Sequence, residues 1–436
     1  MAGRARVHRR LRDDPACRPV PPRRPGRLLG PALPRRGCAA LLVRALPPAM
    51  RIAVVGSGRS VHAIARSVAV AGLGHEVRFV TVGDVLPAPG VEVRTRALPR
   101  GPLAAARAAR GFLTDLRSFG PALLHLHYAG GKLGTMAALS GVRPLVVTVM
   151  GGDVLPEQHA GGLSRLERRA TRRILAAADL LLVKSEALRP ALEAWGGFAG
   201  KCEVVRWGVD PATFHRDVEA AAALRRRLRL SPADRVILSP RPLQPLYNVH
   251  LLVEAMPEVV AHVPSAALVI TEYNADPGYA ARLRQAVAAL GLGDRVQFAG
   301  AVATRDMPGL HSLAEIEASL PSSDGLPQSL FEAMACGTPV VLGRLTAYRE
   351  IVTDGESALL ADLEPRAVAS TMVRLMTDSA LRDRLARTGL ERVREVGFLP
   401  RELQRVDSLY REVVARGAAR ERPRGRLLDL LGLLLR

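Results

Sequence analysis

From Met50 onward the chain alternates short apolar runs with longer segments whose apolar residues recur at helical spacing. In the first series, apolar runs lie at residues 52–55, 75–81, 122–128, 144–150, 180–184 and 202–206, with helical patterns such as 61–71, 102–119 and 163–178 between them. A second series has strands at 235–240, 267–271 and 295–298 and helices at 249–263 and 279–290. Strands alternating with helices form parallel, doubly wound sheets that bind ligands at the carboxyl ends of the strands. The sequence therefore predicts an α/β fold with two such units.

The positive charge of the chain is concentrated near its N-terminus. The net charge is +21 over 436 residues, yet residues 1–49 contain twelve Arg against Asp13 and Asp14, a net +10. Only three of the 62 basic residues are Lys, and aromatic residues that could stack on bases are not interleaved with the Arg residues. Nucleic-acid binding is therefore not expected. We expect instead a solvated basic surface that can rest on anionic lipid.

The two ends of the chain do not follow the alternating pattern. Residues 1–49 are rich in Arg and Pro without periodicity, so we expect a disordered or mis-started extension, with folded structure from Met50. The tail, residues 417–436, ends in an apolar stretch that fits a membrane-surface helix and a packed or frayed terminus equally well. The sequence contains no run of about 18 apolar residues, so no membrane-spanning helix is predicted. The four cysteines show no paired spacing, which predicts neither disulfides nor a zinc site and fits a cytoplasmic location.

Residues 316–342 carry the strongest indication of a binding site. An apolar run ends in small polar residues, Asp324 and Gly325 supply a turn, and a short helical segment follows that Gly337 and Pro339 bring to an end before a new strand. Such a turn aims backbone N–H groups and the positive end of the helix dipole beyond the edge of the sheet. The sequence therefore predicts an anion site at this turn.

Two carboxylates flank the predicted anion site, Asp324 in the turn and Glu332 on the helix. Acids beside a phosphate site suit the hydroxyl groups of a sugar or ribose. The stretch closely resembles the signature of family 4 of the retaining, nucleotide-sugar-dependent glycosyltransferases, in which an acid, seven residues and a Glu precede Ala-Met-Ala-x-Gly-x-Pro-Val-Val. Asp324 stands where that family usually has Glu. Residues 207–214 resemble the family's domain-junction sequence, Gly-Val-Asp followed shortly by Phe.

The resemblance covers about residues 50–415 and implies the GT-B fold, in which two Rossmann-like domains face each other across a cleft. It implies an N-terminal, acceptor-side domain at residues 50–210 and a nucleotide-sugar-binding domain at 211–399. A helix over residues 400–416 is expected to cross back to the N-terminal domain.

On the donor side, Arg241 resembles the family's diphosphate-binding Arg, and its planar guanidinium suits phosphate oxygens. Tyr247 and Asn248 stand where the family usually has Lys-Gly, so Arg241 is the only obvious side-chain cation in that loop. By resemblance, Glu332 accepts hydrogen bonds from the ribose and Asp324 lies beside the hydroxyls of the donor sugar. The donor-binding residues implied are Arg241, Gly325, Leu326, Pro327, Glu332 and, after the first strand, Gly58; the catalytic set is His127, Asp324 and Arg241.

On the acceptor side, His127 ends its strand in a His-x-His pattern common in the family, which makes it a candidate near the reacting centre. Met150 replaces the His of the family's His-Gly-x-Asp. Gly151 and Asp153 survive from that motif and are assigned to the acceptor side. Glu350 matches a family Glu that we expect to be mainly structural.

The leading hypothesis is a retaining glycosyltransferase that moves a sugar from a UDP- or GDP-linked donor to a glycan or lipid-linked acceptor. No cofactor is expected, and no obligatory metal, because no Asp-x-Asp triplet is present. The alternative is a catalytically degenerate nucleotide-sugar-binding protein or subunit, motivated by the changes at positions 150, 247–248 and 324. The expected partners are the donor, the acceptor and an anionic membrane surface, without nucleic acid. The expected location is the cytoplasm, including the inner face of the membrane.

Overall fold

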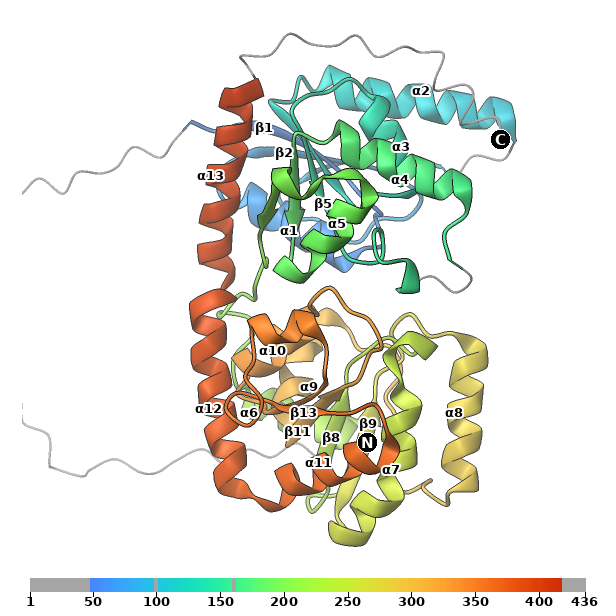
Figure 1. The fold of residues 1–436 in the computed structure, drawn as a ribbon, viewed down its shortest axis with the longest axis vertical. Coiled ribbons are helices and arrows are strands. Elements are labelled where there is room, and N and C mark those ends of the chain that lie inside the picture. Colours follow the sequence, from blue (N-terminus) through green and yellow to red (C-terminus); the bar gives the residue numbers. More distant parts are fainter. Residues whose placement is uncertain (1–47, 98–100, 159–161, 418–436) are drawn as a thin grey trace, which may run out of the picture. The chain divides into compact units, whose positions relative to one another are not determined.

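The computed structural model describes residues 48–97, 101–158 and 162–417 (Figure 1). The chain divides into two compact units, residues 1–48 and 49–436, and every helix and strand below belongs to the second unit. The extension predicted over residues 1–49 and the alternatives for the tail fall almost entirely outside the described residues.

The first sheet has seven parallel strands in the order β3-β2-β1-β4-β5-β6-β7. The strands are β1 (Arg51–Val55), β2 (Glu76–Val82), β3 (Glu92–Arg96), β4 (Leu123–His127), β5 (Leu145–Thr148), β6 (Leu180–Val183) and β7 (Cys202–Val204). Its helices are α1 (Val61–Ala71), α2 (Pro102–Ser118), α3 (Gly131–Leu139), α4 (Arg165–Ala177) and α5 (Arg189–Gly196), with short 3-10 turns η1 (Pro156–Gln158), η2 (Glu186–Leu188) and η3 (Ala199–Lys201). The inner strands β4, β5 and β6 are buried throughout, which explains why they read as continuous apolar runs.

The second sheet has six parallel strands in the order β10-β9-β8-β11-β12-β13. The strands are β8 (Arg235–Ser239), β9 (Ala266–Ile270), β10 (Val296–Phe298), β11 (Ile316–Ser319), β12 (Val340–Gly343) and β13 (Leu359–Ala361). The helices are α6 (Val218–Arg227), α7 (Val249–His262), α8 (Pro277–Ala289), α9 (Met307–Leu313), α10 (Gln328–Ala335), α11 (Pro365–Thr377) and α12 (Ser379–Val396), and the 3-10 turns are η4 (Pro245–Tyr247), η5 (Thr304–Asp306) and η6 (Thr346–Glu350).

Two parallel sheets with helices between their strands confirm the predicted α/β, doubly wound fold. The pattern of apolar runs missed the edge strands β3 and β13. The sequence of β3, Glu-Val-Arg-Thr-Arg, has no fully buried position and shows no apolar run. The strand β13 is buried throughout but has only three residues.

The chain passes between the two sheets at residues 204–210 and returns at residues 396–399. The two passages lie side by side, since Val209 pairs with Phe398 and donates its N–H to the carbonyl of Gly397 at 2.7 Å. Gly208 is required here, because a Cβ atom at this position would lie 2.1 Å from the oxygen of Gly397. The stretch at 207–214, which resembles the family's junction sequence, therefore makes a close backbone contact with residues 396–399, where the chain returns to the first sheet.

The last described helix, α13 (Leu399–Gly417), packs against the first sheet (Figure 1). Its buried apolar residues share a core with β1 and β2. The hydroxyl of Tyr410 hydrogen-bonds Nδ1 of His125 on β4 at 2.6 Å, and Asp407 contacts Nε2 of His75 at 2.9 Å. No helix among the described residues is long and apolar enough to cross a membrane.

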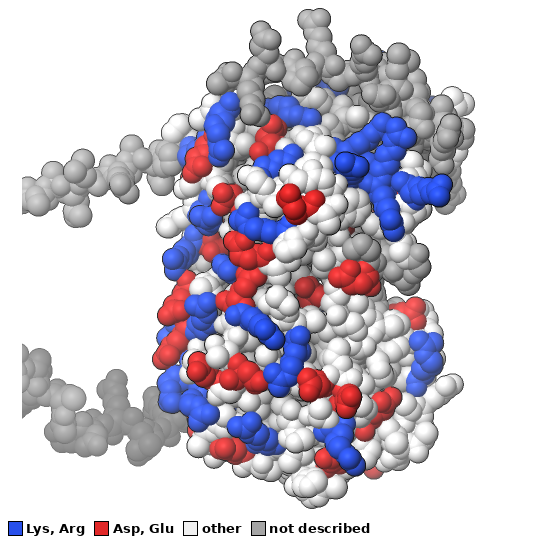
Figure 2. Space-filling view, viewed as in Figure 1, with Lys and Arg blue, Asp and Glu red and all other residues white. Residues whose placement is uncertain are grey.

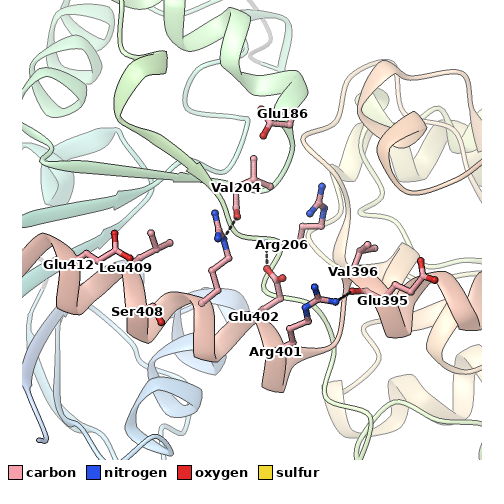
Figure 3. Close-up of a pocket in the computed structure, with 11 residues that line it drawn as sticks. Glu186, Val204, Arg206, Glu395, Val396, Arg401, Glu402, Ser408, Leu409 and Glu412 are labelled. Carbon is pink, nitrogen blue, oxygen red and sulfur yellow. Dashed lines mark hydrogen bonds between the residues drawn. The ribbon is translucent and has the colours of Figure 1, made fainter. Parts of the chain in front are cut away.

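A cavity of about 470 Å³ lies where α12, α13 and the end of β7 meet (Figure 3). Charged residues that line it bind neighbouring groups: Glu402 accepts from the backbone N–H of Arg206 at 2.6 Å, and Arg405 donates to Glu203 at 2.7 Å. Arg401 donates to the carbonyl of Glu395. The cavity is therefore part of the passage between the sheets, distinct from the predicted site at residues 321–341.

Candidate functional site

The predicted anion site lies in the loop that joins β11 to α10. Gly325 and Leu326 donate no backbone hydrogen bond to any other described residue, and Pro327 at the N-cap gives the helix no side-chain cap. Leu326 has a φ of 90°, a left-handed conformation that is costly for a branched residue and is found mainly at functional sites. The loop thus presents N–H groups and the positive end of a helix without satisfying them.

The guanidinium of Arg241 is paired with Asp324 of this loop. Its Nη2 donates to Oδ2 of Asp324 at 2.7 Å, and the hydroxyl of Tyr348 donates to the same oxygen at 3.1 Å. Arg241 also lies over the ring of Tyr247 at 4.5 Å, a cation–π contact. Tyr247 therefore does not supply the positive charge of the family's lysine. Its ring instead packs against the guanidinium of Arg241. Asp324 stands beside Arg241 in the same site, as the predicted grouping requires.

Several buried polar atoms near this loop have no partner among the described residues. They include Nε of Arg241, Oγ of Ser239 at the carboxyl end of β8 and Oγ of Ser329 in the first turn of α10. Arg241 is only 7% exposed, so an unpaired donor on its guanidinium is costly unless a ligand satisfies it. These atoms and the loop N–H groups are donors without a partner among the described residues, and they lie at the carboxyl ends of β8 and β11 and at the start of α10.

Glu332 on α10 belongs to a buried Glu–His–Glu cluster. Its Oε2 lies 3.3 Å from Nε2 of His311, whose Nδ1 lies 2.8 Å from Oε2 of Glu317. Burial alone would lower the pKa of His311, but attraction by Glu317 and hydrogen bonds to both carboxylates raise it to about 10. A protonated His311 fixes the Glu332 side chain, of which one oxygen is free to accept hydroxyl hydrogen bonds.

Lys184 reaches the same loop from the other sheet. It follows β6 directly, is 4% exposed, and its Nζ donates to the carbonyl of Leu326 at 3.2 Å. Burial, and next the positive charge of Arg66, lower the pKa of its ammonium to about 7. A buried lysine of the N-terminal domain thus contacts the loop that carries Asp324.

His127, the predicted catalytic residue, ends β4 with its ring 4.2 Å from that of His125. Its Nδ1 is buried without a partner among the described residues. Burial, and next the neighbouring His125, hold the pKa of His127 well below its ordinary value, so the imidazole is neutral at physiological pH. His125 is structural, with Nε2 at 2.7 Å from Thr148 and Nδ1 bound to α13. Of these two rings, that of His127 is the one with a nitrogen that has no partner among the described residues.

Arg66 on α1 is a second buried cation of the first domain. Its Nη1 donates to Sδ of Met150 at 3.3 Å, its guanidinium lies over the ring of Trp207 at 4.8 Å, and its Nη2 has no partner among the described residues. Burial lowers the pKa of Arg66 to about 9. Met150, at the position where the family has His, therefore contacts a cation rather than supplying one.

The glycines and the acid assigned to the acceptor side shape the loops around the site. Both oxygens of Asp153 accept backbone N–H groups, at 2.8 Å from Ala129 and at 3.0 Å from Met150 and Gly151. A Cβ at Gly325 would lie 3.1 Å from the carbonyl of Met150 and 3.5 Å from Cα of Gly151. The loop assigned to the acceptor therefore packs directly on the loop assigned to the donor.

Gly58 lies farther along the first sheet, in the turn after β1. Its N–H donates to Oγ1 of Thr81 at 3.1 Å, and a Cβ at this position would lie 2.4 Å from the carbonyl of Asp84. Close packing on the segment after β2 is thus one reason for glycine at this position; its predicted contact with the donor stays a prediction.

Glu350 ties the two domains together. It accepts from Oγ of Ser185 at 2.5 Å and from the N–H groups of Glu186 and Ala187 at 3.1 and 2.9 Å, and Arg206 donates to it at 3.3 Å. The carboxylate therefore caps the first turn of η2 from across the domain boundary. This geometry fits the structural role expected for Glu350.

Three buried residues of the site were not identified from the sequence: Lys184, Arg66 and His311. For His311 the sequence held a signal, because Glu317 interrupts an otherwise apolar strand and a buried carboxylate needs a partner. For Lys184 the signal was a lysine directly after a fully apolar strand in a chain with only three lysines. Arg66 carried no comparable signal, since Arg is abundant throughout the chain.

Solved structures with the same architecture place the chain in the GT-B class. Anabaena Alr3699/HepE, solved in complex with UDP and glucose, aligns with a TM-score of 0.71 at 19% identity, over 83% of this chain and 100% of that chain. Sucrose-phosphate synthase from Thermosynechococcus elongatus aligns with a TM-score of 0.72 at 22% identity, over 84% of this chain and 100% of that chain. These likenesses confirm the predicted fold class.

Family models divide the chain at the same place as the two sheets. The model described as Glycosyltransferase Family 4 matches residues 54–213, and the model described as Glycosyl transferases group 1 matches residues 221–392. A D-inositol 3-phosphate glycosyltransferase of Mycolicibacterium gilvum is 30% identical over 390 residues, which are 83% of this chain and 85% of that protein. The chain belongs to glycosyltransferase family 4, as the sequence resemblance predicted.

Other relatives match over a shorter length. A GDP-mannose-dependent alpha-(1-6)-phosphatidylinositol monomannoside mannosyltransferase of Mycolicibacterium smegmatis is 30% identical over 238 residues, 53% of this chain and 60% of that protein. The protein of the same name from Mycobacterium tuberculosis is 33% identical over 242 residues, 53% of this chain and 61% of that protein. The chain thus spans about three fifths of the length of these mannosyltransferases.

Proposed function

We propose that this protein is a retaining glycosyltransferase that moves a sugar from a UDP- or GDP-linked donor to a glycan or lipid-linked acceptor. Family membership supports the reaction class. The named relatives use GDP-mannose or act on inositol phosphate, and Alr3699/HepE was solved with UDP-glucose. The observation that carries the proposal is the set of unmet donors around Asp324: the loop N–H groups, Nε of Arg241 and the start of α10.

The diphosphate of the donor fits this set of donors. Fixed N–H groups, a helix N-terminus and a guanidinium stabilise the negative charge that grows on the phosphate as the bond to the sugar breaks. Glu332, held by His311, is placed to accept hydrogen bonds from the ribose hydroxyls. Asp324, held by Arg241 and Tyr348, is placed to accept them from the donor sugar.

The proposed reaction retains the anomeric configuration. The bond between the anomeric carbon and the phosphate oxygen breaks, the acceptor oxygen bonds to the same face of that carbon, and the acceptor proton passes to an oxygen of the leaving phosphate. This route needs no protein nucleophile. The neutral imidazole of His127 contributes a hydrogen bond to the sugar through its unpartnered nitrogen. Because the protein supplies Arg241 and N–H groups for the phosphate charge, the proposal includes no obligatory metal ion.

The experiment is a transfer and hydrolysis assay of the purified protein with a panel of UDP- and GDP-linked sugars, with and without a chelator. We expect turnover of one donor class that the chelator leaves unchanged. NMR of the product should show the anomeric configuration of the donor. Nucleotide binding without hydrolysis or transfer would favour the catalytically degenerate alternative. An inverted product would contradict the proposed reaction course.

We also propose that the protein works at an anionic membrane surface, through α4. Its exposed side carries Leu166, 47% exposed, and five arginines: Arg165, Arg168, Arg169, Arg172 and Arg173. Its other side, with Ile174 and Leu175, is buried in the core of the first domain. Figure 2 shows a group of basic side chains in the region of α4, whereas acidic and basic side chains alternate along α12 and α13. Each basic residue near an anionic bilayer contributes about 1 kcal/mol.

Vesicle sedimentation tests this second proposal. We expect the protein to bind vesicles that contain phosphatidylglycerol more strongly than neutral vesicles. Binding should fall in the Arg169→Glu/Arg173→Glu variant and persist in a control with the same charge change on α12, Arg387→Glu/Arg394→Glu. Equal loss in both variants would show that total charge, rather than α4, governs the interaction.

A further inference from the structure

Lys184 is a buried ammonium group with too few partners. It is 4% exposed, and its one hydrogen bond to a described residue runs to the carbonyl of Leu326 at 3.2 Å. An ammonium has three N–H donors, and burying a charge is costly unless it is paired and hydrogen-bonded. The acids that attract it, Asp324 and Glu332, are each engaged with another cation, so neither is a dedicated partner.

The charges around Lys184 are mostly positive. Arg66 and Arg241 both repel its ammonium. Lys184, Arg66 and Arg241 in turn act on His62 of α1. The ring of His62 is accessible to solvent, yet the crowding of protein around it, and then these three cations, lower its pKa to about 3. Cations from both domains thus converge with no equal number of acids, which is the electrostatic setting for a multiply charged anion.

The loop after β8 supplies only one cation to this setting. The ring of Tyr247 lies under Arg241, and the amide of Asn248 donates to the carbonyl of Leu320 at 2.9 Å and to Ser322 at 2.8 Å. Both residues therefore hold the loop and carry no charge. A nucleoside diphosphate has at least two negative charges on its phosphates, so a single guanidinium leaves the site short of one positive charge.

We propose that Lys184 is a donor-binding residue, whose ammonium supplies from the N-terminal domain the second cation for the diphosphate. The inference rests on the proposed function, because it assigns a ligand to the same loop. Arg241 binds Asp324 and Lys184 binds the carbonyl of Leu326, so the two cations hold one loop from opposite domains. A diphosphate seated on the N–H groups of Gly325 and Leu326 would lie between them and would bring the two domains into one binding site.

The choice of lysine has a physical reason. Only three of the 62 Lys and Arg residues are Lys, so a lysine at position 184 is unusual in a chain whose basic residues are nearly all Arg. A compact ammonium fits beside a backbone carbonyl where a planar guanidinium would need more room. Because its pKa is about 7, Lys184 is only partly protonated in the free protein near neutral pH, and a bound anion would favour the ammonium form. Binding of the diphosphate should therefore take up a proton above neutral pH.

Calorimetry with UDP and GDP tests the inference on the full chain. The variants are Lys184→Met, which keeps the length of the side chain without the charge, and Lys132→Met, a control at an exposed lysine of α3. We expect Lys184→Met to weaken binding of the preferred nucleotide by about 10- to 100-fold, the range for one hydrogen bond to a charged group. The Lys132→Met control should bind as the wild type does.

Proton uptake gives a readout that does not depend on the folding of a variant. Titrations of the wild type at pH 8 in two buffers of different ionisation enthalpy should reveal uptake of nearly one proton per nucleotide bound, and little uptake at pH 6. Lys184→Met should take up none. Unchanged affinity in Lys184→Met, or no uptake by the wild type at pH 8, would overturn the role of Lys184 while leaving the donor site in place. If neither UDP nor GDP binds the wild type, both the proposed function and this inference fail.

Discussion

The two halves of the site differ in how they are built. In the second domain, the functional groups come from one continuous stretch, residues 321–332, supported by Arg241 and His311. In the first domain they come from four separate places: Arg66 on α1, His127 at the end of β4, the loop at 150–153 and Lys184 after β6. A local stretch can be recognised as a motif, whereas residues that only the fold brings together cannot.

The halves also differ in their electrostatics. The second domain pairs its charges, Arg241 with Asp324 and His311 with Glu317 and Glu332. The first domain leaves Arg66 and Lys184 without acidic partners of their own, and burial lowers the pKa of both. We infer that the second domain fixes the donor, and that the first domain supplies charge and hydrogen bonds that matter most when the ligand is bound.

The largest effect is expected for Arg241→Ala. Removing one fixed donor to a developing phosphate charge lowers turnover by about 100-fold or more, as for comparable oxyanion contacts. Asp324 would also lose its cationic partner and keep only the hydroxyl of Tyr348. The measurement is kcat/KM with the preferred donor. A matched control is Arg227→Ala, which breaks an exposed ion pair with Asp306 and should leave kcat/KM unchanged. Equal activity of Arg241→Ala and the wild type would contradict the donor site.

A smaller and more selective effect is expected for His127→Ala. If the first domain acts at the reacting centre, kcat should fall by about 100-fold, the low end of the range for a positioned side chain that acts on the reacting group. The Kd for the nucleoside diphosphate should stay the same, because His127 does not contact the loop at Asp324. Comparing kcat with Kd separates the two halves directly. An equal loss of nucleotide affinity and kcat would show that His127 of the first domain also contributes to nucleotide binding.

His311→Gln should change how stability depends on pH. The pKa of His311 is raised from 6.5 to about 10, so its protonation stabilises the folded protein. This stabilisation is fully present below about pH 6.5 and is lost as the pH rises through about 10. The wild type should therefore lose melting temperature between pH 7 and 10, and His311→Gln should lose less over that range while melting lower at pH 7. Parallel curves for the two proteins would mean that Glu317 and Glu332 do not raise the pKa of His311.

The smallest effect is expected for Tyr247→Leu. The ring lies 4.5 Å from the guanidinium of Arg241, and a cation–π contact of a desolvated cation contributes about 1–2 kcal/mol. Removing it should raise KM for the donor by about 5- to 30-fold while kcat changes little. Tyr273→Leu, at a half-exposed ring of the same domain, is the control. A fall in kcat alone would mean that the ring acts on the chemistry rather than on the position of Arg241.

The fold was readable from the sequence because the inner strands of both sheets are largely buried. Buried parallel strands such as β4 and β9 give continuous apolar runs, and glycine or proline marks where helices end, as after α10. The strand β3 was missed because an exposed edge needs no apolar pattern. The donor side was also predictable, since Asp324, Glu332 and the glycine turn lie within nine residues of one another.

The contacts within the site were harder to predict. Arg241 and Asp324 were each assigned to a ligand, and only the fold places them 2.7 Å apart, 83 positions apart in the chain. Lys184 lies 142 positions from Leu326, and no local pattern links them. Contacts between residues so far apart in the sequence depend on how the two domains pack together. Neither the spacing of apolar residues nor the composition predicts that packing.

The most direct test of the donor site is the melting temperature of the purified protein with a panel of nucleoside diphosphates and nucleotide sugars, beside a Glu332→Ala variant. A ligand bound only by the folded state raises the melting temperature according to its affinity. The donor site predicts stabilisation by UDP or GDP and by the sugars linked to it, and loss of that shift in Glu332→Ala. If no nucleotide stabilises the wild type, the loop at Asp324 does not hold a diphosphate and the proposed function is wrong.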